Sequence, residues 1–391
     1  MKKFLYFLLV SLVLVSCKDD FDISKLQDTS RLVVYSFPTA SDTTLVIVTK
    51  SVPVATAKGD RYTISRQPVD AHIIYKVNGV DQTIKKIETE EDVRKFDYYH
   101  INDEGFDQLM IGQYYVVGKQ KAGDNITLEV SADGFQSVSA ATYIPQSVKI
   151  GIDKLSFEEV SSGQSLDNVL ASFTDDGASK DYYSVMVQKS HMEGEVVGVD
   201  VDGSRYVVSD VYQYKDYSEK YPNAVWTFNM HKRSYAQAID TDKEPVLNKT
   251  TKLDEDLGFD DYGYYGLSYI FDDHLLNGKK YTLHLSLAST YYTNDYYYTD
   301  SWDKMFGYTY IVELYKLTPE YYRYLSSINS AQSNSWAEAG IMQVTPTYSN
   351  VRGGFGVVAG YSVSADSVRI KPSGDIDNRY YAKNIGKRTK R

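Results

Sequence analysis

The chain has 391 residues, of which 42% are hydrophobic and 24% charged, a composition that excludes global disorder and allows two folded domains. Its formal net charge is −10, and removal of a leader carrying Lys2 and Lys3 leaves 40 basic against 52 acidic residues, or −12. This balance argues against nucleic acid as a partner, because nucleic-acid affinity depends on Lys and Arg contacts to phosphate. The single cysteine excludes an internal disulfide and a zinc site built on thiolate pairs.

Residues 1–16 have the pattern of a lipoprotein signal peptide. Lys2 and Lys3 precede an apolar run from Phe4 to Val15. This run is too short to cross a bilayer comfortably, since a spanning helix needs roughly 20 residues. No later segment approaches that length, so we expect no transmembrane helix elsewhere in the chain.

The end of this leader predicts a lipid anchor at Cys17. Leu14, Val15, Ser16 and Cys17 resemble the bacterial lipobox, in which the cysteine carries a thioether-linked diacylglycerol and an N-acyl chain and becomes the first residue of the mature protein. The alternative is a chance cysteine in an apolar leader. Several acyl chains give stable anchoring, since each buried methylene contributes roughly 0.8 kcal/mol. Apart from this lipid, we expect no cofactor.

The residues after the cysteine predict where the anchored protein faces. Lys18, Asp19 and Asp20 resemble the signal that sends lipoproteins of Bacteroidota-type bacteria to the outer face of the outer membrane. An acidic, solvated linker would have the same composition. We therefore predict an acidic tether over residues 17–30 and a lipid-anchored protein on the outside of the outer membrane.

Residues 31–145 predict an immunoglobulin-like β-sandwich. The region contains short alternating stretches with no helical periodicity between them, and Asn78-Gly79 and Asp133-Gly134 are typical of hairpin turns. The predicted strands are RLVVYSF, TTLVIVTKSV, AHIIYKVNG, QYYVVGKQ, ITLEVSADGF and SVSAATYIP.

Residues 146–371 predict a second, larger antiparallel β domain. Its segments are rich in β-branched and aromatic residues, and a long polar connection follows from His231 to Gly263. The predicted strands are VLASFTD, DYYSVMVQKS, SRYVVSDVYQY, AVWTFNM, YGLSYIF, KYTLHLSLAS and GYTYIVELYKL.

One helix is predicted near residues 319–333, because Thr318 can cap its start and Pro319 suits the first helical position. A glycine-rich return follows at residues 350–370. It lacks the Gly-Lys-Ser/Thr of a phosphate-binding loop, so it predicts a turn into a strand with close backbone packing. Residues 372–391 form a basic tail.

The sequence contains no catalytic motif. There is no Gly-x-Ser-x-Gly elbow and no His-Glu-x-x-His, and the six histidines lack ligand spacing, so we expect a protein that is not an enzyme. One acidic segment has enough carboxylates for calcium but lacks EF-hand spacing, and a solvated loop is the ordinary interpretation. This weak metal candidate comprises Asp254, Asp256, Asp260 and Asp261.

A tyrosine-rich insertion is the predicted contact surface for a ligand or partner. Exposed aromatic rings supply rigid contact area, and consecutive tyrosines cannot all face one core. The alternative is a strand that packs rings on both faces. The candidate contacts are Tyr291, Tyr292, Tyr296, Tyr297, Tyr298 and Trp302.

The order of these segments resembles an uncharacterised lipoprotein family of Bacteroidota, known as domain of unknown function 4249. The resemblance covers about Asp22 to Ile370 and is most specific in DDHLLNGK, YIVELYKLTPEYYRYLSSIN and GGFGVVAGYSVSADSVRI. Members often accompany TonB-dependent outer-membrane receptors, which implies a role in nutrient capture or delivery. The resemblance supplies no catalytic residues.

Together these features predict a surface-exposed outer-membrane lipoprotein that binds a ligand or a receptor partner and is accessory to TonB-dependent nutrient uptake. The ligand class stays open between glycan, peptide and small nutrient. One alternative is a structural or adhesive envelope lipoprotein. Another is a hydrolase with an unrecognised carboxylate site, which a sequence with 52 acidic residues does not locate.

Overall fold

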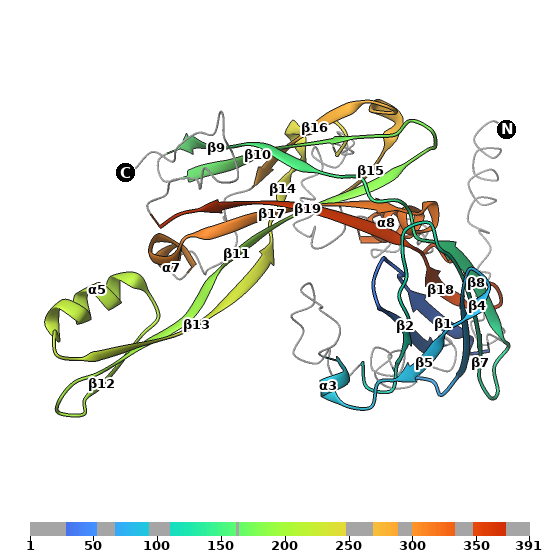
Figure 1. Cartoon of the computed structure of the whole chain (residues 1–391), viewed down its shortest axis with the longest axis horizontal. Coiled ribbons are helices and arrows are strands. Elements are labelled where there is room, and N and C mark those ends of the chain that lie inside the picture. The colour runs from blue at the N-terminus through green and yellow to red at the C-terminus, as the bar shows by residue number, and fades with distance from the viewer. Residues whose placement is uncertain are drawn as a thin grey trace, which may run out of the picture.

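A computed structural model of the chain describes residues 29–52, 67–93, 110–161, 164–247, 269–287, 299–332 and 347–372. Over these residues the fold is mainly β, with nineteen strands in several sheets, as the sequence predicted. None of the described helices has the length and apolar character needed to span a membrane. Figure 1 shows two packed β regions and an arm that projects from the second.

The first β region is a sandwich of two sheets, with strand orders β18-β1-β2-β6-β5 and β4-β3-β7-β8. The core of this sandwich follows from strand alternation, since every second residue of β2 from Thr44 to Val48 is buried. The buried side chains of both sheets form one cluster of mainly Val, Ile and Leu. Asn78 and Gly79 both have positive φ and connect β3 to β4, as predicted. The strands are β1 Leu32–Ser36, β2 Thr43–Lys50, β3 His72–Val77, β4 Val80–Asp81, β5 Thr83–Lys86, β6 Tyr114–Val117, β7 Asn125–Ser131 and β8 Val138–Tyr143, and a short helix, α3, spans Glu90–Val93.

Strand β18 (Phe355–Val358) completes a sheet of this sandwich although it lies more than 300 residues after β1. The two strands pair in parallel, with Val33 opposite Phe355. A Cβ at Gly356 would lie 2.0 Å from the carbonyl oxygen of Val34, so only glycine allows this approach. The glycine-rich return is therefore a turn into a strand with close backbone packing, as predicted. The sequence placed this strand with the second region.

The second β region is a larger sandwich with its own apolar core. One sheet has the order β14-β16-β10-β9, and the other has the order β12-β11-β17-β19, with β13 and β15 also pairing to β11. The strands are β9 Gly151–Ser161, β10 Gln164–Thr174, β11 Tyr182–Val199, β12 Arg205–Val208, β13 Val225–Ala236, β14 Ile239–Asp240, β15 Ile270–Asp272, β16 Lys280–Leu287, β17 Tyr308–Leu317 and β19 Tyr361–Ile370. Two 3-10 helices, η2 Thr241–Lys243 and η3 Asp273–Leu275, lie in its connections.

An aromatic cluster joins the two sandwiches. Helix α8 (Pro319–Gln332) confirms the predicted helix, and its ring at Tyr321 stacks on Phe37 of the first sandwich with centroids 4.7 Å apart. On the other side, Tyr322 of the same helix packs on Tyr182 of β11 with centroids 4.6 Å apart. The helix thus connects the two cores through packed aromatic rings.

The arm is the distal half of β11 together with its neighbours. Up to Ser190, β11 pairs with β17 inside the sandwich, and beyond that residue it pairs with β13 and β12 alone. Two helices absent from the sequence prediction, α5 Val211–Lys220 and α7 Thr299–Phe306, pack along it. The sequence prediction of a strand over 204–214 was wrong for residues 211–214, because the Asp210 carboxylate caps α5 by accepting hydrogen bonds from the backbone amides of Tyr212 and Gln213.

Candidate functional site

Most of the site residues predicted from the sequence lie outside the described residues. They are the lipid attachment residue Cys17; the export residues Lys18, Asp19 and Asp20; the aromatic residues Tyr291, Tyr292, Tyr296, Tyr297 and Tyr298; and the acidic residues Asp254, Asp256, Asp260 and Asp261. These assignments stay predictions. Within the described ranges, no group of three His, Cys, Asp or Glu side chains is placed to hold a metal ion.

Trp302 is the one predicted contact residue that the structure describes, and it is an interior residue. Its side chain is 3% exposed and packs with Val196, Val208 and Val211. The indole Nε1 donates a hydrogen bond of 2.6 Å to the carbonyl oxygen of Ser209. With its ring and its donor both engaged, Trp302 attaches α7 to the arm and offers no surface to a ligand.

A buried ionic cluster holds α7 against the root of the arm. The Lys189 ammonium lies 2.5 Å from the Asp303 carboxylate and 4.4 Å from the centroid of the Tyr308 ring. His191 lies between two carboxylates, with Nδ1 3.4 Å from Asp303 and Nε2 3.1 Å from Glu193. Because the side chains of His191 and Asp303 are only 2% and 3% exposed, this cluster fixes the direction in which the arm leaves the sandwich.

One face of the arm tip is covered by α5. Tyr206 of β12 stacks on Tyr221 at the end of the helix, with centroids 4.1 Å apart. The Trp226 ring lies over Gly198, where a Cβ would come within 2.7 Å of the ring. Beneath these rings Val196 and Val208 are fully buried. The tip is therefore a small folded unit of three strands and one helix.

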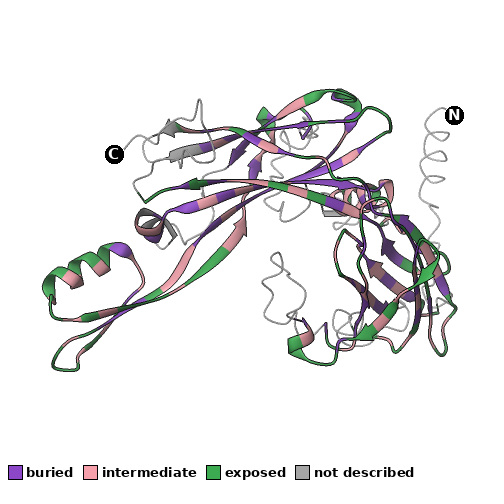
Figure 2. Cartoon of the chain, viewed as in Figure 1, coloured by how far each residue is buried: buried purple, intermediate pink, exposed green. Residues whose placement is uncertain are grey.

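The opposite face of the same three strands is only partly buried: Val197 at its centre is 8% exposed, and the residues around it are open to solvent. Strand alternation turns Val199, Val207 and Val225 away from α5, and they are 43%, 49% and 72% exposed. Val201, in the turn between β11 and β12, is 86% exposed. Figure 2 shows the exposed residues along this part of the chain. We call Val199, Val207 and Val225, together with Val201 in the adjoining turn, the valine face.

Sequence reasoning missed the valine face. The alternation of SRYVVS indicated a strand, but nothing local told whether the second face of that strand meets a core or solvent. The polar connection predicted from His231 onward was also wrong for residues 231–236, which continue β13. Those residues are polar because β13 is largely solvent-exposed, and exposed strands lack the apolar alternation that marks a half-buried one.

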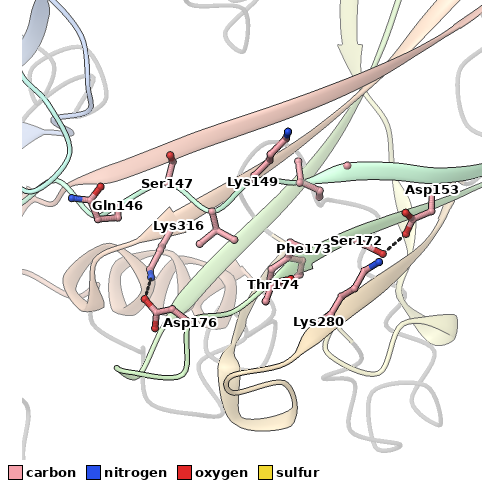
Figure 3. A pocket seen from close by; sticks show the side chains of 13 residues that line it. Gln146, Ser147, Lys149, Asp153, Ser172, Phe173, Thr174, Asp176, Lys280 and Lys316 are labelled. Carbon is pink, nitrogen blue, oxygen red and sulfur yellow. Dashed lines mark hydrogen bonds and ion pairs between the residues drawn. The ribbon is translucent and has the colours of Figure 1, made fainter. Parts of the chain in front are cut away.

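A second candidate is a cavity beside the linker, residues 144–150, which runs from β8 of the first sandwich to β9 of the second. Figure 3 shows this cavity of about 540 Å³, a volume in the range of small-molecule sites. Its charges nearly cancel: Lys149, Lys280 and Lys316 line it together with Asp153 and Asp176. Lys316 lies 3.7 Å from Asp176, and Asp153 accepts a hydrogen bond from Ser172. The lining therefore selects no charged class of ligand, and we rank this cavity below the arm.

The carboxylates behind this cavity are structural. The buried hydroxyl of Tyr183 donates a hydrogen bond of 2.5 Å to Asp175, and Lys316 donates one of 2.6 Å to Asp181. Burial and the adjacent carboxylates raise the pKa of Tyr183, so its hydroxyl remains a donor. Asp175 and Asp181 are 2% and 5% exposed and fully engaged, which leaves them unsuited to act on a substrate.

Comparison with known proteins places the chain in a family. The family model described as a domain of unknown function (DUF4249) matches residues 18–367. The chain belongs to the DUF4249 family. No curated protein matches this DUF4249 chain. Among solved structures, a chain titled "Biofilm associated protein - B domain" aligns over 90% of this chain and 88% of its own length, with 7% identity and a TM-score of 0.15, which is too low to carry a structural argument.

Proposed function

We propose that this DUF4249 protein is a lipid-anchored, surface-exposed outer-membrane lipoprotein that binds a protein partner through its arm. In this proposal the partner is a TonB-dependent receptor, and the protein is a non-enzymatic accessory to nutrient uptake. The valine face is the observation that carries the proposal. Apolar area left in water costs roughly 25 cal/mol per Å², so several exposed valines on a projecting unit favour burial by association.

The position of the arm supports a protein partner over the anchoring membrane. The predicted tether leads from Cys17 to β1, which lies in the first sandwich. The arm leaves the second sandwich at the far side of the molecule, as Figure 1 shows. A lipid anchor at the tether would therefore hold the first sandwich near the bilayer and leave the valine face free to contact another protein.

Crosslinking from the arm tests this proposal. If Cys17 carries lipid, Val201→Cys introduces the one free thiol of the mature chain, and a photoreactive label there reports what touches the valine face. We expect the label to capture a TonB-dependent receptor in intact cells. The matched control is Val80→Cys, a position 64% exposed on β4 of the first sandwich. Equal capture of the receptor from both positions, or capture from neither, would contradict the proposal.

The anchor is tested separately through Cys17. We expect Cys17→Ala to leave the membrane fraction and to lose labelling by a radioactive fatty acid, because the lipid supplies the membrane affinity. External protease should digest the wild-type protein on intact cells if it faces outward. Continued lipid labelling of Cys17→Ala would show that the anchor lies elsewhere.

A structural or adhesive envelope protein is the second candidate function. The stacked rings of Tyr206, Tyr217 and Tyr221 at the arm tip favour it, because they form a rigid aromatic surface of the kind that contacts glycans and proteins. Deletion of the gene separates the two functions. Loss of surface attachment with normal nutrient uptake would support adhesion, and the reverse would support the accessory role.

A further inference from the structure

Strand β13 presents a long edge with no neighbour in the described part of the chain. Its twelve residues pair with β11 along one side, from Val225 opposite Val199 to Ala236 opposite Gln188. No strand pairs with the other side among the described residues. Most of the strand is exposed or half-exposed. Such an edge offers backbone donors and acceptors to any extended segment that can approach it.

A comparable edge in the same sheet is covered, which makes the bare edge of β13 distinctive. Strand β19 has ten residues, and the linker and β9 lie along it. Ser364 donates a hydrogen bond to the carbonyl oxygen of Val148 and accepts one from the backbone amide of Ile150. The backbone amide of Ile152 donates to the Asp366 carboxylate at 2.8 Å. This edge is thus protected by the protein's own chain.

The charge of β13 is opposite to that of the protein. The strand contains no acidic residue, whereas the whole chain has 52 of them and a net charge of −10. Its centre carries the run His231, Lys232 and Arg233. Glu193 lies 3.4 Å from Arg233 and offsets that charge, while Lys232 is exposed and forms no ion pair with a described residue. The edge therefore carries net positive charge at its middle.

This charge disfavours a second copy of the chain as the occupant. Two β13 strands paired antiparallel about Lys232 would bring both His-Lys-Arg runs side by side, and like charges across a strand pair are destabilising. An acidic strand would instead place carboxylates beside Lys232. The same residues thus disfavour self-pairing in that register and favour an acidic partner.

We propose that the edge of β13 that pairs with no described strand docks an extended, acidic segment of a partner protein, which adds to the arm as a further strand. Backbone hydrogen bonds to β13 fix its register, and carboxylates meet Lys232 at the centre of the strand. Alternate side chains of the added strand lie beside Val225 and extend the valine face. This inference rests on the proposed function in taking the occupant to be a protein.

A fluorescent peptide of about ten residues, in which glutamate alternates with threonine and valine, tests the edge on the full-length protein in detergent. We expect it to bind and to protect the amides of residues 225–236 from hydrogen exchange. The counterpart peptide with lysine in place of glutamate should bind at least about fivefold more weakly, as charge pairs at a strand surface allow. A glutamate peptide methylated at alternate backbone amides should bind at least about tenfold more weakly, since it cannot form the backbone ladder.

Two variants test whether binding of the glutamate peptide depends on Lys232 of β13. Lys232→Glu should weaken binding of the glutamate peptide about fivefold, and Lys215→Glu, an exposed residue of α5 on the same arm, should leave it within about twofold. Equal binding of the glutamate and lysine peptides, or protection outside residues 225–236, would overturn the inference. So would protection of 225–236 that grows with protein concentration in the absence of peptide, because it would identify a second copy as the occupant. Receptor capture at Val201→Cys together with a failed peptide test would reject this inference and retain the proposed function.

Discussion

The two β regions differ in what they bury. In the described part of the first sandwich the core is apolar, and Asp124 is the one buried carboxylate. The described part of the second region buries six carboxylates together with Lys316 and His191; the carboxylates are Asp167, Asp175, Asp181, Glu244, Asp273 and Asp303. Burying a charge is costly unless it is paired and hydrogen-bonded. Apolar packing therefore stabilises the first sandwich, whereas the second region combines its own apolar core with buried ionic groups, and one cluster of these groups lies at the root of the arm.

Breaking the ionic cluster at the root of the arm should have the largest effect. Asp303→Ala leaves the Lys189 ammonium, whose side chain is 21% exposed, without its buried carboxylate, and we expect the free energy of unfolding to fall by about 3 kcal/mol. Denaturant unfolding measures the change, and hydrogen exchange should show faster exchange over the arm.

Two further variants control for this effect. The double variant Lys189→Met with Asp303→Leu should recover most of the loss, because an apolar pair needs no charge partner. Asp216→Ala, on the exposed surface of α5, should leave the unfolding midpoint nearly unchanged. A loss below about 1 kcal/mol for Asp303→Ala would show that the second region does not depend on this pair.

The closing strand of the first sandwich should show the next largest effect. Gly356→Ala places a Cβ 2.0 Å from the Val34 carbonyl oxygen at a φ of +105°, so β18 must shift away from β1. We expect a loss of about 2 to 3 kcal/mol in the free energy of unfolding. Gly203→Ala has a similar positive φ but open space around its Cβ and should cost about 1 kcal/mol. Equal losses for the two variants would mean that backbone conformation, rather than the β1–β18 contact, requires glycine at 356.

The smallest effect belongs to an exposed ion pair of the first sandwich. Lys86 donates a 2.8 Å hydrogen bond to Asp70 and holds the pKa of that carboxyl below its usual range, while Asp70 raises the pKa of Lys86. Because its pKa is lowered in the folded protein, Asp70 stabilises the fold at pH values above its unfolded pKa of about 3.9. This stabilisation is lost as the pH falls through the folded pKa. Because its pKa is raised in the folded protein, Lys86 stabilises the fold at pH values below its unfolded pKa of about 10.4. This stabilisation is lost as the pH rises through the folded pKa.

Thermal unfolding of Asp70→Asn should therefore show a slightly lower midpoint than the wild type near neutral pH, and the difference should vanish in acid. The midpoint at several pH values measures this. A difference that persists well below a pH of about 3 would assign the effect to packing instead of charge.

Local patterns in the sequence predicted the elements that form against a core. The helix at Pro319–Gln332 and the hairpin at Asn78-Gly79 follow from residue types with a fixed conformational preference. The parallel pairing of β1 with β18 was not predictable, because its partners are separated by more than 300 residues and the contact leaves only glycines as a signal. Helix α5 did leave a signal, in the capping residue Asp210.

The candidate site was the least predictable part of the molecule. Exposed aromatic residues were expected to form the contact surface, yet Trp302 is buried under the arm. The valine face carries no motif, since valine has the same strand preference whether it meets a core or solvent. Only the arrangement of β11, β12 and β13 shows that Val199, Val207 and Val225 lie on the side of the arm that faces away from α5.

Quantitative co-isolation tests most directly whether the arm binds the receptor. The anchored wild-type protein and the variants Val225→Asp and Val80→Asp should be isolated from cells at equal expression, and the amount of TonB-dependent receptor retained should be measured. We predict that Val225→Asp, which puts a charge into the valine face, reduces retention at least about tenfold, while Val80→Asp on the first sandwich retains the wild-type amount. Equal retention by all three proteins would contradict the account.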